Sequence, residues 1–445
     1  MEKYPLRIPV LITCLAASVA LPLAASERTL YHGATLIDGT GAVPRPAMSI
    51  LVSDGVIESV MPDSDATELD ATRVSADGLY AIPGLIDTHV HLATPPDADR
   101  SRTLLRRQVQ SGITGVRSMA DDVRSVAELA RQALTGEIPA PDIHFAALMA
   151  GPSFFDDPRT IAVTRGHVPG HTPWMQAIDA ETDIAAAVAI ARGTSASGIK
   201  LYANLEAEAI VRITAEAHRQ GIPVWAHAAV FPALPVDNIL AGVDVISHSC
   251  PLAYQVSSST PVSYQDPMPV DARQFQDGIP PAMIELFARM AAQGIILDAT
   301  NLVYARHEAA YAARAEGRPP RCSAMLTYQL TRAAYLQGVR IASGTDGDNP
   351  PEAPWPSLHD ELEILAGPVG MAPMDVLLAA TSVAAAAMNA SDTQGTVEPG
   401  KLANLVFLKA DPLQDVSNLR EVAFTLKRGA VHRRTASADK VPSAR

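Results

Sequence analysis

The sequence has little positive charge for its size. Its 445 residues include 35 Lys and Arg against 48 Asp and Glu, which gives a formal net charge of −13 at pH 7. Binding to nucleic acid needs clustered cations that meet the phosphates, so we expect no nucleic-acid partner. Two motifs are also missing: the Gly-x-Ser-x-Gly turn of serine hydrolases, and a glycine-rich phosphate turn after an early strand. These absences disfavour a serine nucleophile and a nucleotide-binding sheet.

Long apolar runs are scarce, and the one that is present lies at the N-terminus. Lys3 and Arg7 precede residues 8–25, which carry no charge and end in small residues. This pattern is typical of a cleaved signal peptide, here 1–26, with Glu27 opening the mature chain. An uncleaved membrane anchor is the alternative, because a spanning helix needs about 20 apolar residues. After signal removal we expect no membrane span, and we predict a periplasmic or secreted protein.

Cysteine is rare as well, with three residues in the chain. Cys14 lies inside the predicted signal peptide, which leaves Cys250 and Cys322 in the mature protein. An exported protein meets an oxidising environment in which two cysteines can pair, but their spacing alone does not identify a pair. Of the two interpretations we favour two buried thiols over a disulfide.

Both ends of the mature chain have the pattern of β-structure. In 27–83, short β-rich runs flank Asp54-Gly55, a dipeptide typical of a tight hairpin turn. Runs of the same kind return in 391–434. We therefore expect a small composite β-sandwich domain built from both termini, followed by a polar, disordered tail at 435–445.

Between these ends, short apolar runs alternate with helical patterns. Eight such runs, often β-branched, stand at 81–86, 115–118, 143–149, 198–202, 222–226, 243–247, 294–299 and 339–343. This alternation predicts a (β/α)₈ TIM barrel over 84–390. The span exceeds the roughly 250 residues typical of this fold. The excess falls in loops 150–180 and 250–278, which follow strands and so overhang the catalytic end; a doubly wound open sheet is the structural alternative.

Four of the twelve histidines stand at the C-terminal ends of predicted strands, where TIM barrels place active sites. The first two are His89 and His91, which follow the stretch 83–87, Pro-Gly-Leu-Ile-Asp. Side chains alternate along a strand, so both imidazoles point into the barrel mouth while Val90 points outward. Two imidazoles at this spacing make a rigid bidentate metal clamp.

Four further strand positions carry polar residues. Lys200 lies within a strand, His227 and His248 each end an apolar strand, and Asp346 follows the last strand. Structural interpretations exist for each: a lysine paired with a barrel carboxylate, a satisfied core histidine, and an aspartate that caps the next helix. The functional interpretation is a metal centre in which the Lys200 amine has reacted with CO₂. The resulting carbamate is an oxygen-donor anion able to bridge two metals.

In sequence order, these residues resemble the amidohydrolase superfamily over nearly the whole mature chain. The similarity is greatest to the branch that contains imidazolonepropionase-like proteins and bacterial Xaa-Pro dipeptidases. The matching pieces are 83–91, Lys200 in Gly-Ile-Lys, His227, His248, 343–346 and 395–404. After His248, the run Ser-Cys-Pro departs from the Gly-containing run common in this branch, which bears on the substrate.

The resemblance implies two divalent metal ions, with Zn²⁺ as the expected identity. By the family's pattern, the ligands are His89, His91 and Asp346 for one ion, His227 and His248 for the other, and carbamylated Lys200 as the bridge. Imidazolonepropionases lack the bridging lysine, so Lys200 argues against that activity. Asp346 is the implied general base, which takes a proton as metal-activated hydroxide attacks.

We expect a metal-dependent hydrolase that cleaves an amide or peptide-like C–N bond of a small substrate, such as an N-acyl amino acid or an X-Pro dipeptide. A lactone or other ester hydrolase on the same metal centre is the alternative, and a non-catalytic binding relative is a third. A homo-oligomer is an open alternative to a monomer. The two long loops carry aromatic residues that would favour an apolar acyl part: Phe154, Phe155, Trp174, Tyr254 and Tyr264.

Three residues near predicted strand ends are candidates for substrate contacts. Arg117 could clamp a substrate carboxylate with its planar fork, or could instead pair with Asp121 or Asp122. Tyr202 could donate a hydrogen bond to a developing oxyanion, or simply pack. His144 is expected near the barrel mouth, where it could touch the substrate, and a surface or loop position is its alternative.

Overall fold

The computed structural model describes residues 28–434, apart from 267, 315–318 and 351. The predicted signal peptide at 1–26 and the predicted tail at 435–445 lie outside the described residues. Within the described ranges, no helix is both long enough and apolar enough to cross a membrane.

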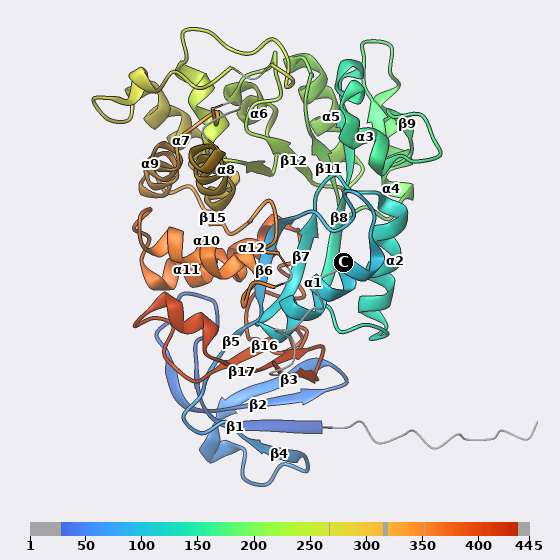
Figure 1. The fold of residues 1–445 in the computed structure, drawn as a ribbon. Coiled ribbons are helices and arrows are strands. Elements are labelled where there is room, and N and C mark those ends of the chain that lie inside the picture. Colours follow the sequence, from blue (N-terminus) through green and yellow to red (C-terminus); the bar gives the residue numbers. More distant parts are fainter. Residues whose placement is uncertain (1–27, 267, 315–318, 351, 435–445) are drawn as a thin grey trace, which may run out of the picture.

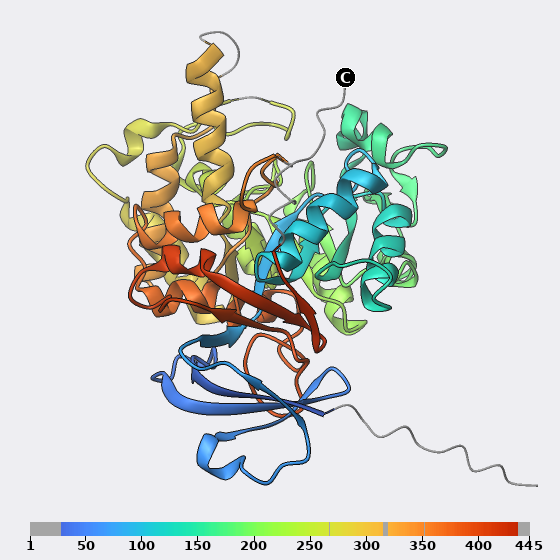
Figure 2. The same ribbon diagram turned by 60° about the horizontal axis from the view of Figure 1, so that its bottom comes forward.

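The two ends of the described chain build one β-sheet, seen at the bottom of Figures 1 and 2. Its strands are β1 (Arg28–Leu36), β2 (Arg45–Ser53), β3 (Val56–Pro62), β4 (Thr72–Ser75), β5 (Tyr80–Pro83), β16 (Leu405–Leu408), β17 (Val422–Lys427) and β18 (Ala430–His432). Antiparallel pairing of β5 with β16 joins the two ends, with Pro83 opposite Leu405. The sheet is mixed, because β1 runs parallel to β4 and β5. The predicted composite β-domain is confirmed, and hydrogen bonds join its strands into one continuous sheet.

Strands β2 and β3 form the hairpin that the Asp54-Gly55 dipeptide predicts. Asp54 and Gly55 have φ values of 51° and 77°, which are the left-handed values that a two-residue hairpin turn needs. Side chains from both ends of the chain meet in the core of this domain. Phe407 stacks on Phe424 with ring centroids 4.5 Å apart, and Tyr31 lies 5.4 Å from Phe407. The C-terminal strands therefore complete a core that the N-terminal strands begin.

Eight parallel strands form the barrel: β6 (Leu85–Val90), β7 (Ile113–Ser118), β8 (Asp142–Ala150), β11 (Gly198–Leu201), β12 (Val224–His227), β13 (Val245–Ser247), β14 (Ile296–Asp298) and β15 (Ile341–Ala342). Neighbouring strands pair in this order from β6 to β15. Backbone bonds from Thr88 N to the Ser343 carbonyl and from Asp346 N to the His89 carbonyl, each 2.9 Å, join the last strand to the first. The predicted (β/α)₈ TIM barrel is confirmed, and its closure brings the segment around Asp346 beside the His-x-His strand.

Helices cover the outside of the barrel, as Figures 1 and 2 show. The longer ones are α1 (Ala98–Gln110), α2 (Val123–Leu134), α4 (Ile184–Gly193), α5 (Ala207–Arg219), α7 (Pro281–Gln293), α8 (Asn301–Arg314), α9 (Ala324–Leu336) and α10 (Ser357–Ala366). Shorter ones are α6 (Pro235–Ala241), α11 (Pro373–Ala379), α12 (Ser382–Ala387) and η5 (Val416–Arg420), whereas η1 (Asp63–Asp65) lies beside β2 in the sheet domain. Each buries one face; in α5 the buried residues Ile210, Ile213 and Ala217 recur every three or four positions.

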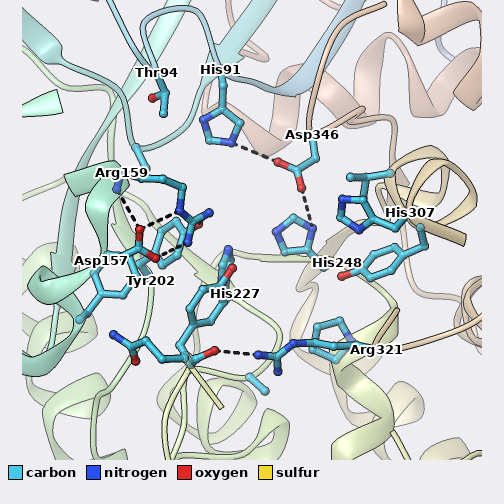
Figure 3. A pocket seen from close by; sticks show the side chains of 18 of the residues that line it. His91, Thr94, Asp157, Arg159, Tyr202, His227, His248, His307, Arg321 and Asp346 are labelled. Atoms are coloured by element: carbon cyan, nitrogen blue, oxygen red, sulfur yellow. Dashed lines mark hydrogen bonds and ion pairs between the residues drawn. The ribbon is translucent and has the colours of Figure 1, made fainter. Parts of the chain in front are cut away.

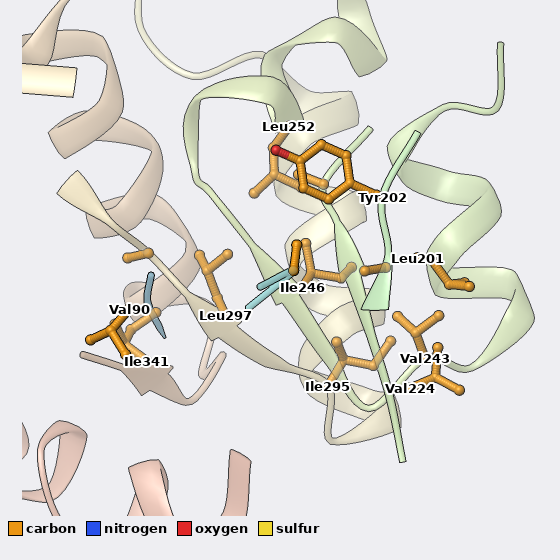
Figure 4. Packing of buried hydrophobic residues seen from close by; sticks show 14 of the residues in the cluster. Val90, Leu201, Tyr202, Val224, Val243, Ile246, Leu252, Ile295, Leu297 and Ile341 are labelled. Atoms are coloured by element: carbon orange, nitrogen blue, oxygen red, sulfur yellow. The ribbon is translucent and has the colours of Figure 1, made fainter. Parts of the chain in front are cut away.

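Apolar side chains pack against both faces of the barrel strands. Outward-pointing residues such as Leu201 and Ile246 pack in the main core between strands and helices (Figure 4). Inward-pointing residues form a smaller cluster inside the barrel that includes Trp225, Val245 and Ile296. Because side chains alternate along a strand, the next inward position on each of these strands lies two residues further on. Those positions are the strand ends at the barrel mouth, where active sites of this fold form.

The two long loops contain short elements of their own. Loop 150–180 holds η2 (Pro152–Asp156), α3 (Pro158–Val163), β9 (His171–Thr172) and β10 (Met175–Ala177), and loop 250–278 holds η3 (Cys250–Val256) and η4 (Ala272–Phe275). A disulfide joins Cys250 to Cys322, with Cα atoms 5.9 Å apart. The sequence-based preference for two buried thiols is therefore wrong, because the fold brings together residues 72 positions apart. The bond ties the start of the second loop to the segment before α9.

Candidate metal centre

A cavity of about 910 Å³ opens at the C-terminal ends of the barrel strands (Figure 3). Five of the six predicted metal ligands line it: His89, His91, His227, His248 and Asp346. The sixth, Lys200, is fully buried on β11 and does not line the cavity. The parallel barrel therefore gathers strand ends that are far apart in the sequence into one site.

Asp346 is the point of contact between histidines from different strands. Its Oδ1 lies 3.1 Å from Nε2 of His91 and 3.4 Å from Nε2 of His89. Its Oδ2 lies 3.9 Å from Nδ1 of His248. One potential ligand atom from each of His89, His248 and Asp346 lies within 4.8 Å of the other two. This spacing allows three side chains to share one cation.

The four histidines form a continuous cluster. Ring centroids are 5.6 Å apart for His89 and His91, 4.9 Å for His89 and His248, and 4.7 Å for His227 and His248. His91, His227 and His248 are labelled in Figure 3, where they lie around the same part of the cavity. Packing of imidazoles from three strands at one end of a barrel concentrates nitrogen donors, which suits a transition-metal site.

The backbone at His248 and Asp346 has positive φ values, 76° and 53°. Such values are uncommon for residues other than glycine, and they cluster at functional sites. Gly344, just before Asp346, has no room for a side chain. A Cβ there would lie 2.0 Å from Oδ1 of Asp298 and 2.7 Å from Cβ of His89. The close approach of these segments therefore requires the glycine.

Burial favours neutral imidazoles in this cluster. Desolvation lowers the pKa of His248 to about 3 and lowers the pKa of His227 well below its usual value. Burial also opposes the charge on Asp346, but the neighbouring histidines, His89 first, outweigh it and hold the pKa of the carboxyl below its usual range. Neutral imidazole and ionised carboxylate are the forms that bind divalent cations.

His91 differs from the other three histidines because carboxylates flank it. Burial acts to lower its pKa, but Asp121 and Asp346 outweigh that effect and raise the pKa to about 10. Its Nδ1 lies 3.8 Å from Oδ1 of Asp121 and, among the described residues, has no hydrogen-bond partner. Oδ2 of Asp121 accepts a 2.8 Å hydrogen bond from the backbone N–H of Leu92, which fixes the carboxylate beside His91. A bound cation would take the place of the proton on His91.

Lys200 is surrounded by neutral or distant groups. Its Nζ donates a 3.1 Å hydrogen bond to Oγ of Ser247, and no carboxylate of the described residues lies within ion-pair distance. Desolvation, aided by the charge on Arg117, lowers the pKa of Lys200 to about 7. The alternative interpretation, a lysine paired with a barrel carboxylate, therefore does not describe this structure.

Asp298, at the end of β14, is a residue that the sequence interpretation missed. It is fully buried and accepts hydrogen bonds from the Thr88 hydroxyl (3.0 Å), His89 Nδ1 (2.9 Å), Arg117 Nη2 (3.0 Å) and the Ser247 hydroxyl (3.1 Å). A carboxylate at Nδ1 fixes the ring so that Nε2 faces the cavity. The bond that Lys200 donates to Ser247 connects the lysine to the same network.

The signal for Asp298 is present in the sequence. Residues 295–298 read Ile-Ile-Leu-Asp, so an apolar strand ends in a polar residue. The strand that ends in His227 and the strand before His248 have the same pattern. Burial opposes ionisation of this carboxyl, but His89 and Arg117 hold its pKa below the usual range. An ionised, buried carboxylate therefore supports the first histidine of the cluster.

Arg117 lies inside the barrel below the mouth. Its Nε donates to the Thr88 carbonyl (2.6 Å), its Nη1 to the Ala387 carbonyl (3.0 Å), and its Nη2 pairs with Asp298 (3.0 Å). The guanidinium lies 4.6 Å over the ring of Trp225 in the cluster that fills the barrel. The interpretation of Arg117 as a clamp for a substrate carboxylate is wrong, because the residue is fully buried, does not line the cavity, and already has a partner for each of its three nitrogens. Arg117 also does not pair with Asp121 or Asp122, the acidic residues after β7; its ion pair is with Asp298.

His144 lies away from the cavity as well. Strand β8 spans Asp142–Ala150, so His144 stands near its N-terminal end, at the side opposite to the mouth. Its Nε2 lies 3.4 Å from Nε2 of Gln394, and it is not among the residues that line the cavity. The interpretation of His144 as a substrate contact is therefore wrong.

Tyr202 does line the cavity, as part of an aromatic wall beside the histidines. Its ring lies 4.2 Å from that of His227 and 4.6 Å from that of Phe154. Tyr264, from the second long loop, lies 5.3 Å from Tyr202 and 5.5 Å from His227. The other aromatic residues predicted for the roof are buried in the packing of the loops: Phe155, Trp174 and Tyr254.

Comparison with solved structures supports the fold. The chain resembles a Xaa-Pro dipeptidase solved with bound methionine in its active site, with a TM-score of 0.70 and 22% identity over 92% of this chain and 100% of that one. A putative prolidase from Bifidobacterium longum has a TM-score of 0.68 and 24% identity, covering 93% and 97% of the two chains. For the A. niger ochratoxinase the values are 0.70 and 21%, covering 92% and 96%.

Curated proteins give no significant match to this sequence. A family model, however, matches residues 80–433, which include the barrel, its cavity and the C-terminal strands of the composite sheet. The match therefore covers every residue of the candidate metal centre. On this basis, the chain belongs to the amidohydrolase family.

Proposed function

We propose that this protein is a metal-dependent hydrolase that cleaves the amide or peptide-like C–N bond of a small substrate, an N-acyl amino acid or a dipeptide such as X-Pro. The observation that carries this proposal is the meeting of His89, His91 and His248 around the Asp346 carboxylate at the mouth of the cavity. Membership of the amidohydrolase family supports hydrolysis as the reaction class.

The residues at the mouth fit divalent metal ions. Imidazole nitrogens and a carboxylate suit Zn²⁺, and the Asp298 carboxylate at Nδ1 of His89 leaves Nε2 free to face Asp346. His89, His91 and Asp346 would hold one ion, His227 and His248 would hold the second, and a carbamate on Lys200 would supply oxygen ligands to both. When bound, such ions lower the pKa of a water molecule towards about 7 and polarise a carbonyl oxygen.

The environment of Lys200 supports the carbamate. CO₂ reacts with a neutral amine, and a buried lysine with a pKa of about 7 holds a large neutral fraction at pH 7. Among the described residues no carboxylate occupies the amine, which is held by the Ser247 hydroxyl. The reaction forms a C–N bond between Nζ and CO₂ and releases one proton.

Asp346 is the proposed general base. It is ionised, it contacts three histidines of the cluster, and it reaches the cavity. Its carboxylate takes the proton of the attacking water as the new C–O bond forms. It then passes that proton to the leaving nitrogen as the C–N bond breaks. Tyr202, in contact with His227, is the candidate donor to the developing oxyanion.

The choice of substrate class has two supports. Solved structures with this fold include a Xaa-Pro dipeptidase, an ochratoxinase, and a prolidase complexed with N-methylphosphonate-L-proline. The cavity of about 910 Å³ is at the upper end of the roughly 300–1,000 Å³ range of small-molecule sites, and Phe154 and Tyr264 give it an aromatic wall. These features favour a substrate with an apolar or aromatic acyl part.

We also propose that the enzyme works outside the cytoplasm. The disulfide between Cys250 and Cys322 supports export, because such bonds form and persist in oxidising compartments. N-terminal sequencing of the mature protein from its native host tests this proposal. A start near Glu27 is expected, whereas a folded product that still begins at Met1 would contradict cleavage.

The activity is tested with protein stripped of metal by a strong chelator and then reloaded with Zn²⁺, Mn²⁺ or Co²⁺. The panel contains N-acyl amino acids and X-Pro dipeptides, with the matching esters and lactones for comparison. We expect hydrolysis of amides that disappears on stripping and returns on reloading. Full activity of metal-free protein, or hydrolysis of the esters and lactones without any amide, would refute the proposal.

A further inference from the structure

The proposed substrates carry a carboxylate, and Arg117 is not available to bind it. The cavity is lined by four other residues that can be cationic: Arg159, His307, Arg314 and Arg321. In an N-acyl amino acid, the carboxylate carbon lies three bonds from the reacting carbonyl carbon, which is about 4 Å. A residue that recognises this carboxylate must therefore lie close to the metal centre.

The guanidinium of Arg321 holds the loop above the cavity. Its Nη2 donates to the carbonyls of Tyr264 and Asp266, both at 2.7 Å, and its Nη1 lies 3.3 Å from the Tyr254 hydroxyl. His307 is exposed on α8, next to Tyr304. The guanidinium of Arg321 therefore has a structural role in the roof. Arg314 is exposed further along α8, and no hydrogen bond or ion pair with another described residue orients it or His307.

Arg159, on α3, is held beside the candidate metal centre. Its Nε and Nη2 donate to the two carboxylate oxygens of Asp157, at 3.0 and 2.7 Å. Its Nη1 lies 3.5 Å from the Tyr202 hydroxyl, and the Tyr202 ring contacts that of His227. One tyrosine ring therefore separates Arg159 from a proposed metal ligand, as the labelled side chains in Figure 3 show.

The guanidinium of Arg159 has a fixed orientation, but only part of its hydrogen-bonding capacity is used. Asp157 occupies one edge of the guanidinium in a bidentate pair, which fixes its plane. The contact of Nη1 with Tyr202, at 3.5 Å, is too long to be a strong hydrogen bond. Nη1 thus remains available to an anion in the cavity that Arg159 lines, and about half of the side chain is exposed.

We infer that Arg159, oriented by Asp157, is the residue that recognises the carboxylate of the substrate. The inference rests on the proposed hydrolysis of carboxylate-bearing amides, and it adds the residue that selects them over neutral amides. The aromatic wall of Phe154, Tyr202 and Tyr264 lies next to the same guanidinium, since Arg159 is 5.8 Å from the ring of Tyr264. A substrate with a carboxylate close to an apolar group matches this arrangement.

The test compares N-benzoyl-L-alanine with N-benzoyl-L-alaninamide, which differ only in the terminal group, a carboxylate in the first and a neutral carboxamide in the second. For the Zn²⁺-loaded wild type, Arg159→Gln and Arg159→Lys, we would measure kcat/KM for release of benzoate and the Kd of each compound by calorimetry. Arg165→Gln is the matched control, because Arg165 is exposed on the same loop and does not line the cavity. Circular dichroism checks that each variant is folded.

We expect the wild type to prefer the carboxylate, and Arg159→Gln to reduce that preference about 10- to 100-fold while the amide changes little. Arg159→Lys should recover part of the preference, and Arg165→Gln should retain all of it. Equal losses on both compounds, or a preference that survives Arg159→Gln, would overturn the inference; loss in His307→Gln instead would reassign the role.

The binding measurement separates this inference from the proposed function. If the wild type hydrolyses neither compound but binds the carboxylate through Arg159, the proposed reaction fails and the carboxylate site stands. If the wild type hydrolyses both compounds equally well, the reaction stands and the role of Arg159 fails.

Discussion

Nδ1 of His89 lies 2.9 Å from Oδ2 of Asp298, and both side chains are buried at the ends of barrel strands. The same carboxylate also accepts hydrogen bonds from the Arg117 guanidinium and the Ser247 hydroxyl, and Ser247 accepts a hydrogen bond from Lys200. One acceptor therefore orients a proposed ligand of the first metal and connects to the proposed bridge. Partners of this kind are a general means of fixing metal-binding imidazoles.

Asp298→Asn should weaken metal binding without removing any ligand. The substitution takes away the charge that orients His89 and leaves Arg117 buried without its ion pair, and we expect a loss of metal affinity of about 10- to 100-fold. Competition with a chelator, followed by metal analysis, measures this. Asp244→Asn is the control, since it alters an exposed His218–Asp244 pair. Equal effects of the two variants would show that Asp298 is not a positioning residue.

Asp346→Asn should reduce kcat far more than it changes substrate binding. The amide keeps the shape of the side chain but cannot take a proton from water, and loss of a general base costs about 10²- to 10⁴-fold. Steady-state kinetics with metal analysis of the same sample provide the measurement. If the variant keeps its kcat and shows only a raised KM, Asp346 would be assigned to substrate binding.

Lys200→Ala should lower the metal content to about one ion per chain if the lysine carries the bridging carbamate. The pocket left by the side chain would admit a small carboxylic acid, and acetate or propionate should restore part of the activity. Metal analysis before and after such addition checks both expectations. Two ions per chain in the variant would refute the bridging role.

The strand-end residues could be predicted because two rules act together. Side chains alternate along a strand, and a closed parallel barrel brings all C-terminal strand ends to one mouth. These rules place His89 and His91 on the same face and bring His227 beside them, as the structure has them. His248 follows the inward position of Ser247, and it faces the other histidines from a backbone with a φ of 76°, which alternation does not predict. Asp298 obeys the same rules and could have been predicted from the polar end of its strand.

How deep a side chain lies in the barrel, and which way it points, were harder to predict. Arg117 stands near a strand end, but its long side chain lies over Trp225 inside the barrel, and sequence periodicity carries no information on that choice. His144 could have been rejected as a substrate contact from the sequence, because it is the second residue of the predicted strand 143–149 and the mouth lies at the other end of that strand. Arg159 lies in a loop, where no period applies, and its position depends on the fold of 150–180 as a whole.

Glu361→Gln should change how stability depends on pH. Burial raises the pKa of Glu361 to about 7, although its carboxylate accepts hydrogen bonds from the backbone N–H groups of Asn301 and Leu302 at the start of α8. The pKa in the folded state is above the unfolded value, so the wild type loses stability as pH rises from about 4.5 to 7.

Across that window, the variant should gain on the order of 3 kcal/mol relative to the wild type, because glutamine does not titrate. Denaturant unfolding at pH 4.5, 6 and 8 measures the difference. Glu285→Gln, in an exposed pair with Arg289, should show no such trend. A difference between Glu361→Gln and the wild type that stays constant with pH would contradict the raised pKa.

Reduction of the Cys250–Cys322 bond should loosen the roof of the cavity. The bond joins η3 to the residue after Arg321, whose guanidinium holds the carbonyls of Tyr264 and Asp266. Loss of a cross-link that closes a loop of this length costs about 2–5 kcal/mol of stability. The Tm should fall on reduction, and KM should rise more than kcat falls, because the roof borders the substrate rather than the reacting atoms. The double variant Cys250→Ser/Cys322→Ser should behave like the reduced wild type and should not respond further to reductant. A Tm and KM that are unchanged on full reduction would show that contacts such as those of Arg321 hold the roof without the disulfide.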